Sequence, residues 1–304
     1  MTIRSTAIDA VTGLSLALFF VCALPVVTHA ESAADTIGLT PTSKHREVKT
    51  GERFSDTFTV INGGTTTYDF KVYAKPYTVK DTSYTPVFSQ ENERSDAYRW
   101  VSLPSTTYRI GPGQKIQVPY DVAVSPGARS GGHYGAIFAE AQGVAPEGQT
   151  AVASNKSVGM LLYLNVEGSS ITTGDVSSIA IPFYQPQAPL VATPAITNTG
   201  ETDFMATISF AVMDIAGDVK YQTAAQYTML PDTKRDIRLP WVDSPWFGLY
   251  KARVSVTMLD ETEVKESYVI IAPRWILFLA GLTILLGAID VVRRKRTTTK
   301  HKSH

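Results

Sequence analysis

Histidines and carboxylates are the residues of this chain that could bind a metal or move a proton, and their spacing supports neither role. One histidine falls near the N-terminus, two fall in the last four residues, and two lie far apart between them: His29, His45, His133, His301 and His304. A zinc site needs several such ligands, typically with two of them a few residues apart. The sequence therefore predicts no metal site.

Other chemical signatures are missing as well. The acidic groups at 214–218 and 260–263 lack the full pattern of a calcium loop, and the second is typical of a solvated hairpin turn. The glycines of 111–113 are followed by no Lys-Ser or Lys-Thr pair, so no phosphate cradle is expected. No serine stands in a nucleophile elbow. We expect no catalytic residue, no cofactor and no enzymatic activity.

Six aromatic residues are the candidates for ligand contact: Tyr77, Tyr84, Tyr98, Trp100, Trp241 and Trp246. The tyrosines accompany 80–99, a polar stretch rich in Ser, Glu and Asp, and loops on rigid scaffolds commonly carry binding. The alternative is a mobile loop without a ligand. Trp241 and Trp246 lie in a Pro-rich connection, where aromatic rings can stack on protein or sugar. The alternative there is a loop that folds over the domain and buries both rings.

The two ends of the chain indicate export and membrane attachment. Residues 1–30 combine a basic start, an apolar run and the sequence Thr28-His29-Ala30, which is typical of a cleavable signal peptide; an uncleaved anchor is the alternative. Residues 274–292 predict one membrane span, because the run from Trp275 to Val292 has a single charge, Asp290, and its roughly 18 residues extend about 27 Å as a helix. The basic tail at 293–304 is expected in the cytoplasm. The chain is thus predicted to sit in the plasma membrane with its ectodomain outside, on the cell-wall side.

Cysteine content and charge narrow the class of protein further. The only cysteine, Cys22, falls in the signal segment, so the mature ectodomain has no disulfide and no thiolate site. A lipid anchor at Cys22 would favour a small preceding residue, where the chain has Val21. Residues 31–273 hold 20 Lys and Arg against 26 Asp and Glu, an excess of six negative charges. This balance argues against nucleic acid as a partner.

The elements that position these side chains are predicted to be β-strands. Apolar and polar residues alternate in 54–60, 68–74, 116–122 and 254–258, and turns rich in Gly, Pro and Asn separate the runs. This pattern predicts an all-β fold, with two tandem immunoglobulin-like β-sandwiches followed by a single C-terminal transmembrane helix. We place the first sandwich at 31–142, a linker at 143–155 and the second sandwich at 156–273.

An internal repeat supports two domains of one kind. Three pairs of segments recur in the same order: Thr59–Gly64 with Pro194–Gly200, Ile116–Tyr120 with Ile237–Trp241, and Gly132–Ala136 with Gly248–Ala252. The Asn-Gly turn of the first pair can reverse two strands, and the proline of the second can blunt a sheet edge. The Gly-x-Tyr of the third places a tyrosine that can pack inward and bond by its hydroxyl. The extra length of the first copy is expected in 80–99.

Several short segments carry a resemblance to a known family. In the first domain they are Leu39-Thr40-Pro41, Gly51, Val60-Ile61-Asn62-Gly63, Pro112-Gly113, Pro119 and Gly132-x-Tyr134-Gly135, and in the second Gly159-x-Leu161, Asn198-x-Gly200 and Gly248-x-Tyr250. With the order of signal peptide, two sandwiches, span and basic tail, they resemble the WxL-interacting protein family of Gram-positive cell surfaces. The resemblance implies peptidoglycan binding by the first domain. It implies a secreted surface protein or a host component as partner of the second, and it assigns no contact residue.

Three functions remain open at this point. The first is a membrane-anchored cell-surface scaffold that binds peptidoglycan or a secreted surface protein through strand edges and loops. The second is a pilus-chaperone-like assembly factor, since periplasmic pilus chaperones also pair two such sandwiches. Their strand-lending mechanism needs a cleft with a basic pair that anchors a carboxylate, and the sequence does not identify one. The third is a passive surface stalk.

Overall fold

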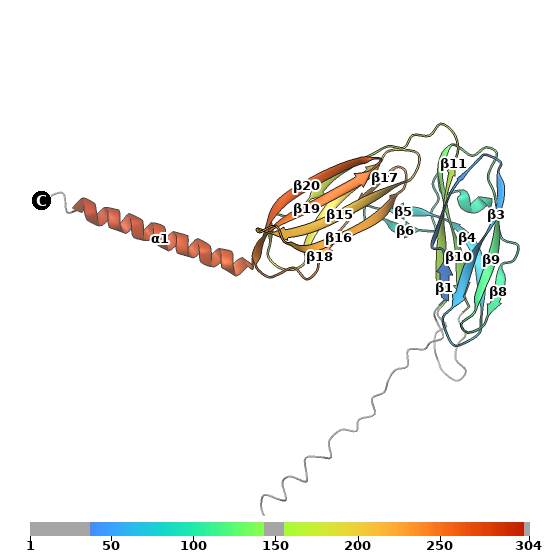
Figure 1. Ribbon diagram of the computed structural model, residues 1–304, viewed down its shortest axis with the longest axis horizontal. Coiled ribbons are helices and arrows are strands. Elements are labelled where there is room, and N and C mark those ends of the chain that lie inside the picture. The colour runs from blue at the N-terminus through green and yellow to red at the C-terminus, as the bar shows by residue number, and fades with distance from the viewer. Residues whose placement is uncertain (1–36, 143–154, 301–304) are drawn as a thin grey trace, which may run out of the picture.

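The computed structural model describes residues 37–142 and 155–300 (Figure 1). The predicted signal peptide at 1–30, with Cys22, and nearly all of the predicted linker at 143–155 lie outside these residues. The described chain forms two β-sandwiches followed by one helix. The prediction of an all-β fold is confirmed.

The first sandwich pairs a four-stranded sheet with a five-stranded sheet. The four-stranded sheet has the order β1 (Ile37–Thr40), β3 (Arg53–Asn62), β9 (Lys115–Ala123) and β7 (Val101–Ser102). The five-stranded sheet has the order β2 (Ser43–Val48), β11 (Lys156–Val166), β10 (Gly131–Ala141), β4 (Tyr68–Pro76) and β8 (Thr107–Ile110). A small hairpin of β5 (Thr78–Lys80) and β6 (Thr85–Val87), and a 3-10 helix, η2 (Ala97–Trp100), complete it.

The core of the first sandwich follows from the period of two. Alternate residues of each strand face the opposite sheet, so Phe58 and Val60 of β3 meet Phe70 and Val72 of β4 inside the sandwich, all of them buried. The intervening residues face outward and are mostly polar. The alternation read from the sequence is therefore the pattern that builds this core.

The boundary between the sandwiches differs from the prediction. Residues 156–166 were expected to open the second sandwich, but they form β11, which pairs with β10 along its whole length. Val158, Met160 and Leu162 of β11 pack against the first core. The boundary therefore lies at 167–173 and not at 143–155. A long connection within one sandwich and a linker between two domains have the same composition, so the sequence could not separate them.

The second sandwich repeats the plan of the first. Its smaller sheet joins β12 (Gly174–Ala180), β14 (Leu190–Asn198) and β17 (Thr233–Asp236), with β18 (Leu239–Trp241) also paired to β14. Its larger sheet has the order β13 (Tyr184–Gln185), β20 (Glu261–Ile271), β19 (Gly248–Met258), β15 (Phe204–Asp214) and β16 (Val219–Met229). Buried aliphatic and aromatic side chains from both sheets fill the space between them.

The repeated Asn-x-Gly motif has the same structural role in both sandwiches. The Nδ2 of Asn62 donates to the carbonyl oxygen of Thr66 at 2.7 Å, and that of Asn198 donates to the carbonyl oxygen of Thr202 at 2.8 Å. Each Oδ1 accepts from the backbone two residues on, at Gly64 or Gly200. Both asparagines are fully buried. The amide side chain therefore satisfies backbone groups where the chain passes from one sheet to the other.

The repeated Gly-x-Tyr motif also has a steric cause. The ring of Tyr134 folds back over Gly132, where a Cβ atom would lie 1.8 Å from the tyrosine Oη. The ring of Tyr250 covers Gly248 in the same way, with ring atoms 2.5 Å from the position of a Cβ. A larger residue would displace the tyrosine at either place, so the glycine is what allows the ring to lie flat on the strand.

The C-terminal segment forms α1 (Arg274–Lys300), which projects from the second sandwich (Figure 1). In the described part of the chain, no helix combines the length and the apolar character that crossing a membrane requires. The side chain of Asp290 and those that follow it lie outside the described residues. The helix is thus observed, and the membrane span stays a prediction.

Candidate functional site

The β5–β6 hairpin connects the two sandwiches. Tyr84, near its tip, accepts a hydrogen bond from the backbone N–H of Leu230 and bonds the hydroxyl of Thr233 at 2.8 Å. The backbone N–H of Asp236 donates to the carbonyl oxygen of Thr82 at 2.8 Å. The guanidinium of Arg235 lies 4.4 Å from the centre of the Tyr84 ring. The expected recognition or mobile loop at 80–99 is thus, over this part, a strut fixed to the second sandwich.

The Tyr84 hydroxyl is neutral at physiological pH, and burial makes it still harder to ionise. Loss of solvent raises the pKa of Tyr84 to about 12, while its bonds to Thr233 and Leu230 lower it. A neutral hydroxyl can accept from Leu230 and still share a proton with Thr233. The contact therefore holds over the physiological pH range.

A second contact joins the start of β10 to the turn at 199–203. The backbone N–H of Gly132 donates to the carbonyl oxygen of Glu201 at 2.9 Å. The hydroxyl of Tyr134 donates to Oδ1 of Asp203 at 3.0 Å, and Arg94 lies 3.6 Å from the Glu201 carboxylate. We call this region and the hairpin contact together the junction. It is built from backbone and side-chain bonds of both sandwiches.

Asp203 is a largely buried carboxyl group, and burial disfavours its charged form. Burial raises its pKa above the usual value, although the Tyr134 hydroxyl and the nearby His45 act in the opposite direction. The Nδ1 of His45 lies 3.7 Å from Oδ2 of Asp203. The carboxylate in turn helps burial to raise the pKa of Tyr134. Tyr134 and Asp203 thus form a structural hydrogen bond, and burial of the Asp203 charge opposes it.

Aromatic rings fill the first sandwich's side of the junction. Tyr77 contacts Phe88 and Tyr163, with ring centres 5.8 and 6.0 Å apart, and Tyr163 stacks on His45 at 4.2 Å. Tyr77, Tyr84, Tyr134 and Tyr163 belong to the same buried cluster as the core of the second sandwich. The two domains therefore share apolar packing as well as hydrogen bonds.

A cleft of about 400 Å³ opens beside the junction. Its lining has one basic residue, Arg94, with Glu93 and Asp232 as acidic neighbours. Arg94 already donates to the carbonyl oxygens of Ser130 and Gly132 at 3.5 and 3.4 Å. Among the described residues around this cleft, the basic pair that a pilus-chaperone mechanism would need is therefore absent.

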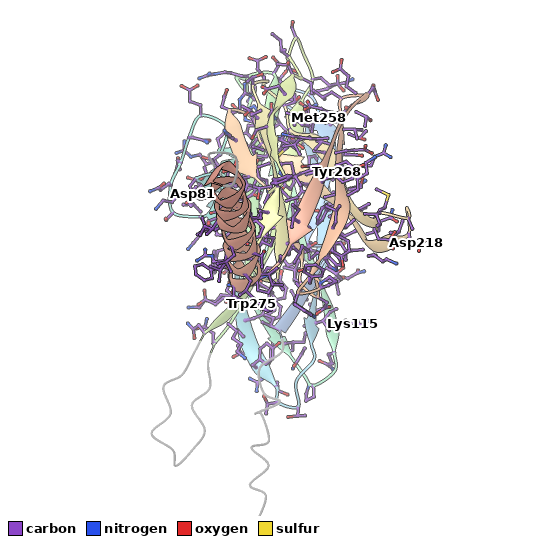
Figure 2. The ribbon with its side chains drawn as sticks, turned by 90° about the vertical axis from the view of Figure 1, so that its left-hand side faces the viewer. Asp81, Lys115, Asp218, Met258, Tyr268 and Trp275 are labelled. Atoms are coloured by element: carbon purple, nitrogen blue, oxygen red, sulfur yellow. The ribbon has the colours of Figure 1, made fainter. Side chains whose placement is uncertain are left out.

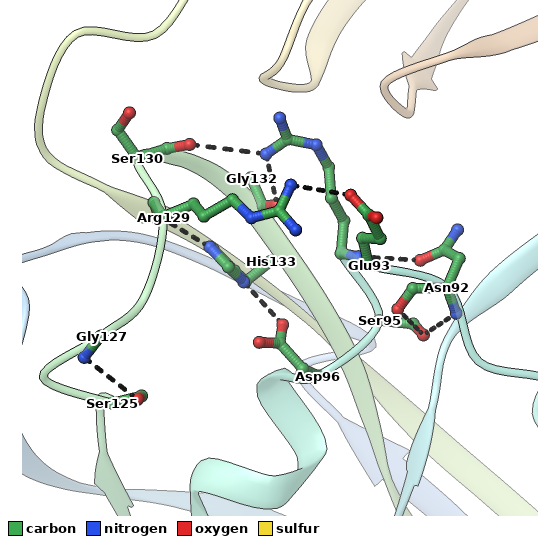
Figure 3. Close-up of polar contacts among 11 residues, drawn as sticks. Asn92, Glu93, Ser95, Asp96, Ser125, Gly127, Arg129, Ser130, Gly132 and His133 are labelled. Atoms are coloured by element: carbon green, nitrogen blue, oxygen red, sulfur yellow. Dashed lines mark hydrogen bonds and ion pairs between the residues drawn. The ribbon is translucent and has the colours of Figure 1, made fainter.

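His133 is the buried histidine of the first sandwich (Figure 3). Its Nδ1 lies 2.6 Å from Oδ1 of Asp96, and its Nε2 lies 2.9 Å from the carbonyl oxygen of Arg129. Both ring nitrogens are hydrogen-bonded. His133 of β10 therefore links Asp96, directly before η2, to Arg129 in the loop that leads into β10. In the described residues no group of three or more His, Cys, Asp or Glu side chains could hold a metal.

The structure disperses the six predicted contact residues. Tyr77 and Tyr84 are buried in the junction, Trp100 is buried in the first core beside His133, and Trp241 is buried in the second core against Tyr221 and Tyr250. Three of these rings are covered by other segments, and Tyr77, although buried, also lines the cleft beside the junction. Burial of a ring depends on which distant segment covers it, which the local sequence does not show.

The other two predicted residues lie nearer the surface. Tyr98 is half-buried and donates its hydroxyl to Oε1 of Glu91 at 2.5 Å. Trp246 is 67% exposed, with the Phe247 ring 5.9 Å away. The alternative that both tryptophans of the Pro-rich connection are buried thus holds for Trp241 and fails for Trp246.

One sheet edge of the first sandwich was not identified from the sequence. Strand β2 pairs with β11 only from Leu161 to Val166, so in the described chain no strand is hydrogen-bonded to the outer side of 156–160, although β1 passes close to β11. The N–H of Leu161 donates outward to the carbonyl oxygen of Thr42 at 2.9 Å. Because backbone direction alternates along a strand, Ser157 and Gly159 point their N–H and C=O groups to the same open side.

Comparisons with known proteins find similar folds and no relative. No family model and no protein of curated function matches the sequence. Similar solved structures include the class 5 fimbriae chaperone CfaA, at 12% identity and a TM-score of 0.39 over 76% of this chain and 99% of that one. The Escherichia coli chaperone DraB matches at 12% identity and a TM-score of 0.37, over 77% and 96%.

A third similar structure is a chain of the CsuC–CsuE chaperone–tip adhesion subunit pre-assembly complex from Acinetobacter baumannii. It is 12% identical, with a TM-score of 0.38, over 77% of this chain and 98% of that one. With TM-scores below 0.5, these similarities carry no conclusion about function. The function is therefore inferred from the geometry of this chain.

Proposed function

We propose that this chain is a non-enzymatic binding protein of the cell surface that holds an extended segment of an exported polypeptide. The observation that carries the proposal is the open edge of β11 at 156–160. Two outward-facing residues there, Ser157 and Gly159, offer backbone donors and acceptors at a place where β2 does not cover the strand. An extended peptide can add to such an edge as a further strand.

The surroundings of the open edge suit a peptide. Val158 and Met160 of β11 point toward the first core, which fixes the strand in its sheet. On the other face Phe138 packs against Gly159, and the aromatic rings of Tyr73 and Phe138 stack 5.6 Å apart. An added strand would therefore lie next to apolar surface on a rigid support, which lowers the entropy cost of binding.

This proposal is closer to the assembly-factor hypothesis than to a passive stalk. It leaves out the basic pair of the chaperone mechanism, because Arg94 in the cleft is already bonded within the chain. Attachment to the membrane through α1 is part of the proposal and rests on the apolar sequence of 274–292. Peptidoglycan binding and the WxL-interacting family rest on resemblance alone.

Site-specific photo-cross-linking tests the proposal in the cells that make the protein. A benzophenone amino acid replaces Ser157 in the full-length chain, and a matched variant carries it at Arg109, an exposed residue of β8 on the opposite edge of the same sheet. We expect a polypeptide adduct at 157 that is weak or missing at 109. Equal labelling at both positions, or a glycan adduct at 157, would contradict strand addition, and the glycan would favour wall binding.

The segment identified by cross-linking then allows a quantitative test. Ser157→Pro removes the outward backbone donor without touching the ladder to β10, and Ser157→Ala keeps it. We expect the proline variant to bind the synthetic segment about tenfold more weakly, as the loss of one hydrogen bond and of close strand contact implies. The alanine variant should bind like the natural chain. Equal affinities for both variants would argue against a backbone-paired complex.

A further inference from the structure

Many large apolar side chains are exposed on the second sandwich, whereas the described residues of the first sandwich contribute none. Some are spread over its surface: Met205, Leu259, Val264 and Tyr268. A larger group, several of them more than half exposed, lies toward the exit to α1: Phe183, Ile215, Val219, Val242, Trp246, Phe247 and Leu249. Exposed apolar groups of this size mark a surface that meets a partner or a lipid phase. We call these seven residues the apolar end.

Strand register places the apolar end around the root of α1. Asp214, the last residue of β15, pairs with Tyr250, and Gly248 at the start of β19 pairs with Ile271. The turn after β15, the loop before β19 and the exit to α1 therefore share one end of the sandwich (Figure 1). Phe183 joins them, because its carbonyl oxygen accepts from the N–H of Ile270 at 2.8 Å.

The root of α1 is hydrogen-bonded to this end. The Tyr184 hydroxyl donates to the carbonyl oxygen of Ala272 at 2.8 Å, and the N–H of Ala272 donates to the carbonyl oxygen of Gln185 at 3.1 Å. Trp275 follows directly, and Figure 2 places it at the sandwich end of the helix. The orientation of the sandwich end is thus set relative to the first turn of α1.

Most of the described side chains of α1 are apolar and exposed, with Arg274 and Thr283 as polar exceptions. Trp275 and Phe278 in its first turns are 58% and 73% exposed, and the same holds for the leucines and isoleucines that follow. A helix that is apolar all round is stable only where apolar matter surrounds it. An apolar phase that surrounds α1 would therefore extend to its first turn, next to the apolar end of the second sandwich.

We propose that the apolar end sits in the boundary between lipid headgroups and acyl chains, with Trp246 and Phe247 inserted beside α1. The inference rests on the proposed attachment through α1. Tryptophan is favoured at this depth because its ring is apolar and its N–H reaches water. Two lysines near the apolar end are paired with carboxylates, Lys220 with Asp214 at 2.8 Å and Lys251 with Glu266 at 2.6 Å.

Tryptophan quenching by brominated lipid tests the proposal with the full chain in phosphatidylcholine vesicles. Trp275→Phe leaves Trp246 as the exposed fluorophore, Trp246→Phe leaves Trp275, and the double variant leaves the buried Trp100 and Trp241 as a background. We expect quenching of Trp246 above this background. It should be stronger with bromine near the headgroup than with bromine near the end of the acyl chain.

The three variants separate this inference from the attachment on which it rests. Quenching of Trp275 without quenching of Trp246 would overturn the seating of the apolar end and leave the attachment intact. Quenching of neither residue would overturn both. Circular dichroism of each variant shows whether the sandwiches remain folded, so that a lost signal is not mistaken for unfolding.

Discussion

Single buried polar residues decide where this chain can turn. Asn62 and Asn198 sit at equivalent places and make equivalent bonds, each to a carbonyl four residues on and to a glycine two residues on. A buried amide that meets all these groups costs little, whereas an alanine would leave several backbone groups without partners. The sequence repeat was visible because this requirement selects the same residue types twice.

Asp203 gives a pH dependence that can be measured at the residue scale. Burial raises its pKa from 3.8, so the folded chain holds a proton at this carboxyl more tightly than the unfolded chain does. Its contribution to stability is therefore fully present below pH 3.8 and is lost as the pH rises through the folded pKa. Asp203→Asn removes this loss. We expect the Tm of the variant, relative to the natural chain, to rise from about pH 4 to about pH 7.

The matched control for this prediction is Asp218→Asn. Asp218 lies in the exposed turn before β16, at the margin of the molecule in Figure 2, and contacts Lys220 at 3.6 Å. Its variant should show no rise of this sign. A difference in Tm between Asp203→Asn and the natural chain that stays constant with pH would refute the assignment.

At the scale of elements, the β5–β6 hairpin of the first sandwich fixes it to the second sandwich. Tyr84→Phe removes the hydroxyl that bonds Leu230 and Thr233 and keeps the ring under Arg235. The Leu230 N–H is then buried without this partner, so we expect a loss of about 1–2 kcal/mol in the free energy of unfolding. Chemical denaturation measures it. Tyr98→Phe, which removes a more exposed hydroxyl, should cost clearly less, and equal losses would contradict the role of the strut.

The two sandwiches are expected to unfold as one unit at the scale of the whole molecule. Tyr77, Tyr84, Tyr134 and Tyr163 of the first domain belong to the buried cluster of the second. Unfolding one domain would expose these rings to water. The lost burial makes unfolding of a single domain unfavourable compared with unfolding of both together. Calorimetry should show one transition, with a ratio of calorimetric to van't Hoff enthalpy of about 1.

A double variant at the junction supplies the comparison. Tyr84→Ala with Tyr134→Ala removes both hydroxyl contacts and much of the shared packing. We expect the single transition to separate into two as the coupling is lost. Two transitions in the natural chain already would show that the junction does not couple the domains.

The extent of prediction differs between local and distant features. Alternation in segments such as 54–60 and 116–122 foretold the strands, because the period of side chains is a local property. The prediction that 156–166 opens the second sandwich was wrong, because a strand pairs with partners that can lie far away in the sequence, here β10. Nothing in the local sequence shows that residues 230–236 bury Tyr84, or that Tyr221 and Tyr250 of the larger sheet pack against Trp241.

The sequence by itself determined the all-β class, the duplicated Asn-x-Gly and Gly-x-Tyr motifs and the C-terminal helix, since each depends on residues close together in the chain. The tertiary structure decided which strand belongs to which sandwich, which aromatic rings are buried and where a sheet edge stays open. These depend on contacts such as Tyr84 with Leu230 and Tyr134 with Asp203. Such contacts form between distant segments, and their free energy comes from the folded arrangement as a whole.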